Sequence, residues 1–360
     1  MAKTRCTPVN DNAAMHADVL YALCAAALFG ASTPFAKYLG GDLPPVMLAG
    51  LLYLGSGLGL TLLRIVRDRG LRTTHLSPGE WPWLLGAVFF GGVLGPVALM
   101  FGLRDTGGAT ASLLLNLEAV LTASLAWVVF GESADRRIVL GMLAIVAGGV
   151  TLGWQSGATA LSGAAGPALV ALACLCWAID NNLTRKVSSS DALFIAGTKG
   201  LIAGAVNTVL AVGMHASLPA WTVVAQTMLV GLLGYGFSLV LFVLALRGLG
   251  TARTGAYFST APFVGSALAL LVFGESTTPL FWIAGALMAL GVWLHLTEHH
   301  AHAHVHEALE HEHAHSHDEH HQHVHAEGQP PGEKHSHRHR HTALTHSHPH
   351  YPDIHHRHVH

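Results

Sequence analysis

Charged residues are scarce in this sequence. Asp, Glu, Lys and Arg make up 11% of its 360 residues, whereas an ordinary globular protein has about a quarter. The formal net charge is −2, and no basic stripe is present to neutralise phosphates, so we expect no nucleic-acid partner. The helices of a soluble enzyme would need polar faces, and the segment from residue 18 to residue 296 offers none. The composition therefore excludes a soluble fold.

Cysteine is also rare, and this absence excludes a disulfide framework. Of the four cysteines, Cys6 lies in the polar N-terminus, while Cys24, Cys174 and Cys176 lie inside apolar runs, where cysteine behaves as a small hydrophobe. The sequence has no nucleophile–base motif and no phosphate-binding glycine loop in a polar context. We therefore expect no enzyme.

Long apolar runs fill most of the chain. A transmembrane helix needs about 20 predominantly apolar residues, and the sequence contains ten such runs, with Trp81, Trp83, Trp154, Trp221 and Trp282 at their ends, where the headgroups would lie. The predicted spans are 18–38, 44–64, 81–102, 109–130, 137–154, 167–186, 191–213, 222–246, 254–273 and 278–297. The sequence thus predicts an all-α, polytopic membrane protein.

Lysine and arginine in the short loops predict the orientation of these spans. One side of the membrane would carry only Lys37 and Arg104, and the other side would carry twelve basic residues. These twelve are Lys3, Arg5, Arg64, Arg67, Arg69, Arg72, Arg136, Arg137, Arg185, Lys186, Arg247 and Arg253. Because cytoplasmic loops are rich in Lys and Arg, we expect an inner-membrane protein with an uncleaved first helix and both termini in the cytoplasm.

An internal repeat divides the spans into two halves. The segment Leu103–Ser133 aligns without gaps on Leu246–Ser276, at a shift of 143, and 11 of the 31 positions are identical. Each half holds five spans. Since five is odd, the second copy crosses the membrane upside down relative to the first, which is the arrangement of many secondary transporters.

These features resemble the drug/metabolite transporter superfamily, and within it the EamA-type permeases, over about residues 18–297. The most specific elements are Phe130–Ser133 and Phe273–Ser276, which end the fourth helix of each half, and Ala261-Pro262 in the ninth span; Glu118-Ala119 replaces this pair in the first half. The resemblance implies gradient-driven export of small organic metabolites or drugs, without an ATP site or a required cofactor.

The predicted domains follow from the spans and the repeat. They are a cytoplasmic N-terminus (1–17), a first EamA-type five-helix repeat (18–154), an external linker (155–166), a second five-helix repeat (167–297) and a cytoplasmic tail (298–360).

Glu118 is a candidate for the transport pathway because it lies midway along the fourth span, close to Asn116. Ionisable groups inside a membrane are costly and often mark pathways or proton relays. Desolvation disfavours the charged form of such a carboxylate, so Glu118 would carry a proton or bind an amine. The alternative is a protonated side chain that hydrogen-bonds a neighbouring helix.

Asp180, Asn181 and Asn182 form a polar cluster in the sixth span, and Lys199 lies in the seventh. At 1.5 Å of rise per residue, Asp180 and Lys199 differ in depth by roughly 4 Å, so an ion pair is easy to form. This pair is either a structural salt bridge or part of the cavity lining, with Asn116, Asn181 and Asn182 as polar neighbours.

Glu132 and Glu275 end the fourth span of each half. A serine follows each of them, and we expect this serine to cap the next helix while the glutamate adds charge at the same positive end.

The C-terminal tail contains all but four of the 28 histidines, in His-x-His runs. It has little apolar surface, so we expect it to be disordered without a ligand. Imidazole binds zinc, nickel, cobalt and copper, so the tail should hold divalent metal ions and release them below about pH 6.5, where His protonates. The candidate ligands are His311, His313, His315, His317, His320, His321, His323, His325, His335, His337, His339 and His341.

Three functions remain open from the sequence. The first is a permease for small organic solutes. The second is an exporter of divalent metal loaded through the tail, although the spans offer few carboxylates as metal ligands. The third is a membrane-anchored metal-binding regulator that transports nothing.

Overall fold

The computed structural model of the protein describes residues 11–41, 43–70, 76–130, 136–155, 165–187, 190–297, 301–306, 310–315, 335–340 and 344–349. Within these residues, ten helical stretches are long and apolar enough to cross a membrane. They are Ala17–Leu39, Pro45–Asp68, Trp81–Asp105, Gly108–Val129, Arg136–Trp154, Ala165–Thr184, Ala192–Gly213, Trp221–Ala245, Thr254–Leu271 and Pro279–Leu296. Each one coincides with a predicted span, so the all-helical, ten-span prediction is confirmed.

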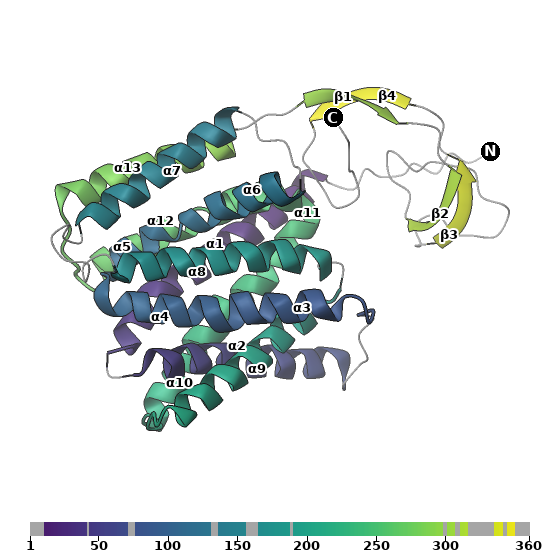
Figure 1. The fold of residues 1–360 in the computed structure, drawn as a ribbon. Helices are drawn as coiled ribbons and strands as arrows, with labels where there is room; N and C mark the ends of the chain where they lie inside the picture. The colour runs from purple at the N-terminus through teal and green to yellow at the C-terminus, as the bar shows by residue number, and fades with distance from the viewer. Residues whose placement is uncertain are drawn as a thin grey trace. The chain divides into compact units, whose positions relative to one another are not determined.

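The helices are arranged as a bundle of long rods (Figure 1). The first half contains α1 (Asp11–Leu39), α2 (Pro45–Asp68), α3 (Trp81–Ala87), the π-helical η1 (Val88–Leu94), α4 (Gly95–Asp105), α5 (Gly108–Leu114), α6 (Leu117–Phe130) and α7 (Arg136–Gln155). The second half contains α8 (Ala165–Thr184), the 3₁₀ turn η2 (Arg185–Val187), α9 (Ala192–Gly213), α10 (Trp221–Gly231), the π-helical η3 (Leu232–Phe237), α11 (Ser238–Phe258), α12 (Ala261–Leu271) and α13 (Pro279–Leu296).

The outer surface of the bundle is apolar. Leu271, Val128, Trp154 and Val209 each expose 70% or more of their surface, whereas Ser32, Asn207 and Thr254 are buried inside. A soluble protein does not expose apolar area on this scale, but lipid is as apolar as these side chains. The bundle therefore has the polarity pattern of a membrane domain.

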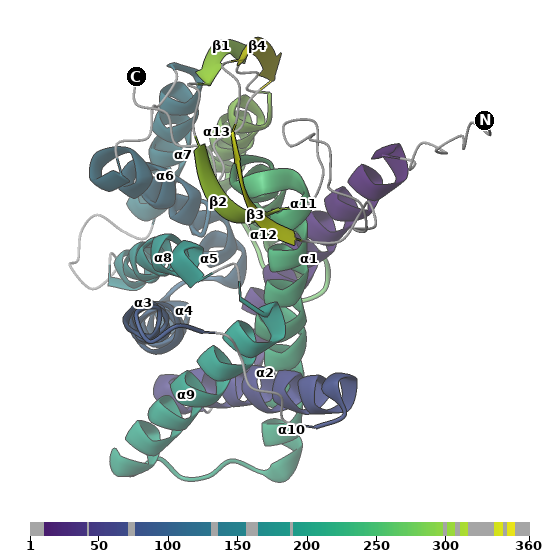
Figure 2. The same cartoon turned by 90° about the vertical axis from the view of Figure 1, so that its right-hand side faces the viewer.

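Helices α2 and α9 cross at glycines that the repeat relates to each other (Figure 2). Gly57 and Gly200 differ by the repeat shift of 143, and a Cβ added to Gly200 would lie 2.5 Å from the backbone nitrogen of Gly57. On either side of this crossing, Gly204 lies against Leu54 and Gly197 lies against Thr61. The shift of 143 relates Leu54 to Gly197 and Thr61 to Gly204, so it converts one of these contacts into the other. The two helices run antiparallel. A two-fold axis in the membrane plane produces this pattern.

Helices α7 and α13, which lie side by side in Figure 1, repeat the pattern. Gly148 packs against Met288, and Gly291 packs against Ile145. The shift of 143 converts Gly148 into Gly291 and Ile145 into Met288. Both helix pairs therefore support the prediction that the two halves are inverted copies.

The segment between the predicted eighth and ninth spans, residues 247–253, is helical and lies inside α11. The predicted boundary between the two spans is nevertheless confirmed, because the eighth span ends at Ala245 and the ninth begins at Thr254. The chain turns back within α11. The rings of Phe242 and Phe258 lie 4.9 Å apart, whereas 16 residues of straight helix would separate them by about 24 Å. The two spans therefore remain distinct.

The tail forms a separate unit, His299–Tyr351, and its described residues are strands. They are β1 (Ala301–His306), β2 (Glu310–His315), β3 (His335–Arg340) and β4 (Leu344–Pro349). β1 pairs with β4 and β2 pairs with β3, both antiparallel. The prediction of a wholly disordered tail was therefore wrong, because the His-x-His alternation has the two-residue period of a strand.

Candidate functional site

Asp180 of α8 and Lys199 of α9 form an ion pair in the interior. Their exposed fractions are 4% and 7%. Thr184 donates a hydrogen bond to the other carboxylate oxygen of Asp180, at 2.9 Å. The carboxylate also occupies the space that a side chain at position 91 would fill, so Gly91 is required there. The ion pair predicted from the sequence is confirmed, and its charges compensate each other in a medium of low dielectric constant.

A π-helical segment lies next to this pair. In η1 the wider turn leaves backbone carbonyls free for other donors. The carbonyl of Gly91 accepts hydrogen bonds from the Tyr53 hydroxyl at 2.7 Å and the Trp177 indole at 2.9 Å. The amide of Asn207 donates to the carbonyl of Gly92 at 3.1 Å. Donors from α2, α8 and α9 therefore meet at one irregular turn of the third span.

The repeat shift maps this π-helical segment onto the second one. Val88–Leu94 shifted by 143 gives residues 231–237, and η3 covers Leu232–Phe237. Irregular turns of this kind are frequent at functional sites. The apolar pattern of the sequence does not predict these turns, and their signal in the sequence is the pair of glycines Gly91 and Gly234 at matching positions.

The fourth and ninth spans are both interrupted at matching positions. In the first half, residues 115–116 separate α5 from α6, and in the second half residues 259–260 separate α11 from α12. Discontinuous helices with free backbone groups form the binding sites of many transporters. Pro262 marks the second interruption, but the first contains no proline.

Glu118 lies two residues after the first interruption, as the second residue of α6, and it is half-buried. The side-chain amide of Asn181 donates to Glu118 Oε1 at 2.8 Å and reaches the Thr122 hydroxyl at 3.4 Å. Among the described ion pairs, none includes Glu118. The structure thus brings Glu118 and Asn181 together, beside Asp180 in the same helix.

The other two predicted asparagines face different partners. Asn116 is buried at the interruption, where its amide donates to Leu113 O at 3.0 Å. Its side-chain oxygen has no hydrogen-bond partner among the residues that the structure describes. Asn182 donates to Ala178 O within its own helix at 2.8 Å and to Thr122 O at 3.5 Å. Neither residue contacts the ion pair through a described hydrogen bond.

Aromatic rings gather around Phe29 of α1. Its ring lies 5.9 Å from Trp177, 5.9 Å from Tyr235 and 5.3 Å from Phe258. The Tyr53 ring lies 5.3 Å from that of Tyr235, at an interplanar angle of 45°. Because Tyr53 and Trp177 also bind Gly91, the aromatic cluster adjoins the polar one. We did not single out these rings from the sequence, since aromatic residues in an apolar run give no sign of converging.

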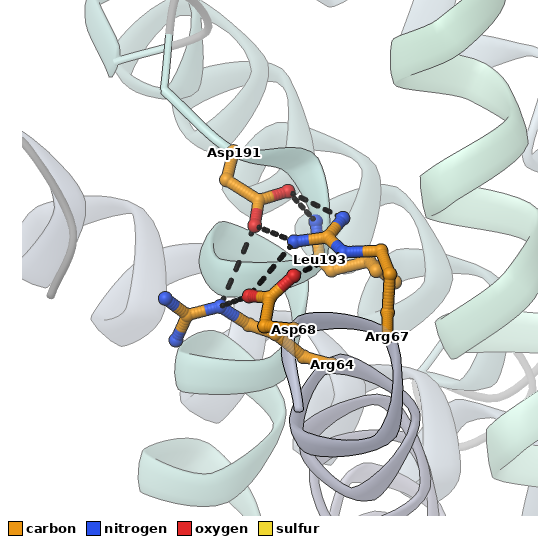
Figure 3. Close-up of polar contacts among 5 residues, drawn as sticks. All are labelled: Arg64, Arg67, Asp68, Asp191 and Leu193. Atoms are coloured by element: carbon orange, nitrogen blue, oxygen red, sulfur yellow. Dashed lines mark hydrogen bonds and ion pairs between the residues drawn. The ribbon is translucent and has the colours of Figure 1, made fainter. Parts of the chain in front are cut away.

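Charged side chains form a cluster at the end of α2 and the start of α9 (Figure 3). Arg67 contacts Asp191 at 2.6 Å and Asp68 at 2.7 Å, and Arg64 lies 3.4 Å from Asp191. Asp191 also accepts a hydrogen bond from the backbone of Leu193, which caps α9. Burial disfavours ionisation of Asp191, but the hydrogen bonds from Arg67 and Leu193 outweigh it and hold its pKa below the usual value. This end of the bundle is called the Arg67 end below.

Glu275 lies at the opposite end of the bundle, called the Glu275 end below, and its role differs from the prediction. It accepts hydrogen bonds from the backbone of Gly108 and Ala109, at the start of α5. Helix α13 is instead capped by Thr278. The prediction that Ser276 and Glu275 serve the next helix in the chain was therefore wrong, because the free N–H groups of α5 are nearer in space. Glu132 lies outside the described residues.

Among the residues that the structure describes, no group of three or more His, Cys, Asp and Glu side chains could hold a metal ion. The tail histidines named above are not placed as side chains, and several of them lie outside the described residues.

Comparison with known proteins gives consistent matches. The model of the EamA-like transporter family matches residues 17–154 and 164–297. An uncharacterized transporter of Methanothermobacter thermautotrophicus is 26% identical over 288 residues, which cover 76% of this chain and 84% of that protein. The uncharacterized transporter YyaM of Bacillus subtilis is 24% identical over 293 residues, 77% of this chain and 93% of that protein.

A solved structure shares the fold. A crystal structure titled only "Crystal structure of protein" aligns with a TM-score of 0.60 and 20% identity, over 78% of this chain and 98% of that one.

Proposed function

This chain belongs to the EamA-like transporter family, and we propose that it exports small organic metabolites or drugs across the inner membrane by alternating access. The observation that carries the proposal is the symmetry of the two helix crossings, α2 with α9 and α7 with α13. At each crossing, the repeat shift of 143 residues converts one glycine contact into another. Inverted halves of this kind surround a site near the midplane and rock about it. The membrane and a small-molecule substrate are its partners.

The pathway that we propose runs along Glu118, Asp180 and Lys199, with Asn116, Asn181 and Asn182 as polar lining. Lys199 compensates the charge of Asp180, whereas the described hydrogen-bond partner of the Glu118 carboxyl group is the neutral Asn181 amide. A carboxylate at this depth is stable when it holds a proton or faces a cation. Glu118 is therefore the proposed exchange point for a proton or an amine group of the substrate.

The basic residues support the orientation that we propose. Arg64 and Arg67 lie at one end of the bundle, and Lys37 and Glu275 lie at the other. Because basic loops stay in the cytoplasm, the Arg67 end would face the cytoplasm together with both termini.

Replacing Glu118 by Gln tests the pathway. A growth screen of a deletion strain on amino acids, nucleosides and drugs selects the transported solute, and its flux is then measured in proteoliposomes. We expect Glu118→Gln to lower the flux at least tenfold and to remove its dependence on pH, because an amide cannot exchange a proton. The matched control is Asp105→Asn, the same chemical change at an exposed helix end. Unchanged flux and pH profile in Glu118→Gln would exclude the proposed role.

A second function, binding of divalent metal by the tail, is favoured by the strand register. In the β2–β3 pair, His311, His313 and His315 stand opposite His339, His337 and His335. Glu310 and Glu312 stand opposite Arg340 and Arg338. Alternate positions of a strand share a face, so one face collects six histidine positions and the other collects opposite charges, which favour this pairing.

Two-stranded sheets are marginally stable in water, so metal bound across the histidine face would stabilise the pair. Zinc, nickel, cobalt and copper are the ions that imidazole binds well. The β1–β4 pair offers a similar register, with His302 opposite His348 and His304 opposite His346.

Zinc titration of the full chain, with a chromophoric chelator as competitor, tests this register. Replacing His311, His313 and His315 by Ala should weaken zinc binding about tenfold more than replacing His355, His356 and His358, which lie outside the described strands. Both proteins should release zinc near pH 5.5, because imidazole protonates below about 6.5. Equal losses of zinc affinity in the two variants would show that the tail histidines bind zinc without any preference for the paired strands.

Removal of residues 299–360 separates the three functions that the sequence left open. Organic export that survives the deletion supports the permease. Loss of metal tolerance with unchanged organic export would favour the metal exporter, and metal binding without any flux would favour the regulator.

A further inference from the structure

Glu275 joins the two halves of the protein at the Glu275 end. Its Oε1 and Oε2 accept hydrogen bonds from the backbone N–H groups of Gly108, at 2.8 Å, and Ala109, at 2.9 Å. These are the first residues of α5, where helical N–H groups have no partner within the helix and the helix dipole is positive. A negative side chain from the second half thus caps a helix of the first half.

Lys37 binds the other side of the junction between α4 and α5. Its ammonium group donates to the carbonyls of Leu103 and Thr106, the latter at 2.8 Å, at the end of α4. The carbonyl end of a helix is negative. Two opposite charges, from α1 and from the residues after α12, therefore hold the two helix ends that meet at residues 106–107.

Aromatic contacts complete the closure. The Phe273 ring packs edge-on against Phe35 at 5.3 Å, and it lies 5.4 Å from the Tyr38 ring at an interplanar angle of 37°. Deeper in the bundle, α12 is tied to α5 by a hydrogen bond from Ser266 to Ala109 O, at 2.9 Å. The first, third, fourth and ninth spans are thus fastened together at this end.

We propose that the Glu275 cap is a gate, and that Glu275 is a positioning residue that holds this end closed while the opposite end admits the substrate. The proposal rests on the alternating access proposed above. When the halves rock, α12 must separate from α5, and the hydrogen bonds of Glu275 are the charge-assisted contacts that this movement breaks. Such bonds are the stronger ones, so their loss should favour the conformation that is open here.

A cysteine introduced at position 112 reports this opening. Ser112 is buried in α5, one turn after the capped residues, and it faces Gly265 of α12. Among the described residues its hydroxyl has no hydrogen-bond partner, so Ser112→Cys loses no described hydrogen bond. The labelling rate with a polar maleimide is measured on the full chain in detergent, and the parent chain with its own cysteines provides the blank.

In the Ser112→Cys background, Glu275→Gln should raise the labelling rate of the introduced cysteine about tenfold, which corresponds to a shift of roughly 1.4 kcal/mol. Gly108→Pro should act in the same direction, because it removes one of the two donors. Proline is tolerated at the first position of a helix, and Gly107 already has the extended conformation (φ −58°, ψ 147°) that a following proline requires. The second variant therefore breaks the cap without disturbing the helix start.

Glu132→Gln is the matched control, since it makes the same change at the position that the repeat aligns with Glu275. It should not raise the labelling rate. Labelling at the parent rate in both cap variants would overturn the proposal. An equal rise in the labelling rate of Glu132→Gln would also overturn it, because it would show that the whole bundle opens more readily and not this end alone. Labelling requires no substrate, so it can be interpreted even if no flux is found. Unchanged labelling in a transporting protein would refute the gate alone.

Discussion

Replacing Lys199 by Met should cost the folded protein about 3–5 kcal/mol, because the substitution leaves the Asp180 carboxylate buried without its cation. Thermal unfolding in detergent, followed by tryptophan fluorescence, measures this loss. Lys186→Met serves as the control, because it removes an exposed lysine near the end of the sixth span. The ammonium group of Lys186 lies 5.9 Å from the centroid of the Trp83 ring, and an exposed cation–π contact contributes about 0.5–1 kcal/mol, so the control should lose much less stability than Lys199→Met.

The double variant Asp180→Asn with Lys199→Met should recover most of that stability, because neutral partners leave no uncompensated charge. Its flux then separates two roles. A recovered flux would identify the pair as a structural salt bridge, whereas a stable protein without flux would place the pair in the pathway. If Lys199→Met melts like the parent, the pair is not the closed, buried contact that the structure shows.

Gly57→Ala and Gly200→Ala should each destabilise the bundle by at least about 1–3 kcal/mol. At both positions the added methyl group would meet backbone atoms of the other helix, which cannot rotate away. Since the repeat relates these glycines, the two losses should be similar. We expect both variants to unfold at lower temperature and to lose transport, because α2 and α9 must move apart to accommodate the methyl group.

Gly153→Ala is the control for this pair. Gly153 lies in α7 and has no atom within 4 Å of an added Cβ, so alanine should leave the stability unchanged or raise it by about 0.5–1 kcal/mol. Equal effects at Gly57, Gly200 and Gly153 would contradict the close crossing of α2 and α9.

The ten spans were predictable from the sequence because apolar length alone determines what can cross a membrane. The ion pair of Asp180 and Lys199 was also predictable. The two residues lie on consecutive spans joined by a short turn, so their depths follow from counting residues. The repeat gave the inversion, since an odd number of spans admits no other arrangement.

The first helix interruption, the π-helical turns and the Glu275 cap depend on contacts between segments that are distant in the sequence, so no local sequence pattern predicts them. The interruption at Asn116 has no proline to mark it, and the π-helical turn at Gly91 depends on donors from Tyr53 and Trp177. Glu275 and Gly108 are 167 residues apart, so sequence reasoning assigned Glu275 to the nearest helix in the chain. The strands of the tail were missed for a different reason, because its polarity was given more weight than its two-residue period.

The sidedness of two positions tests the inverted architecture most directly. Gln155, after the fifth span, and His360, at the C-terminus, are each replaced by a single cysteine, which is labelled with an impermeant reagent in intact and in lysed vesicles. Five spans separate the two positions. The account therefore predicts that only the cysteine at position 155 reacts in vesicles that retain the cellular orientation, and that both react after lysis. Reaction of both cysteines from the same side in intact vesicles would contradict the inverted repeat.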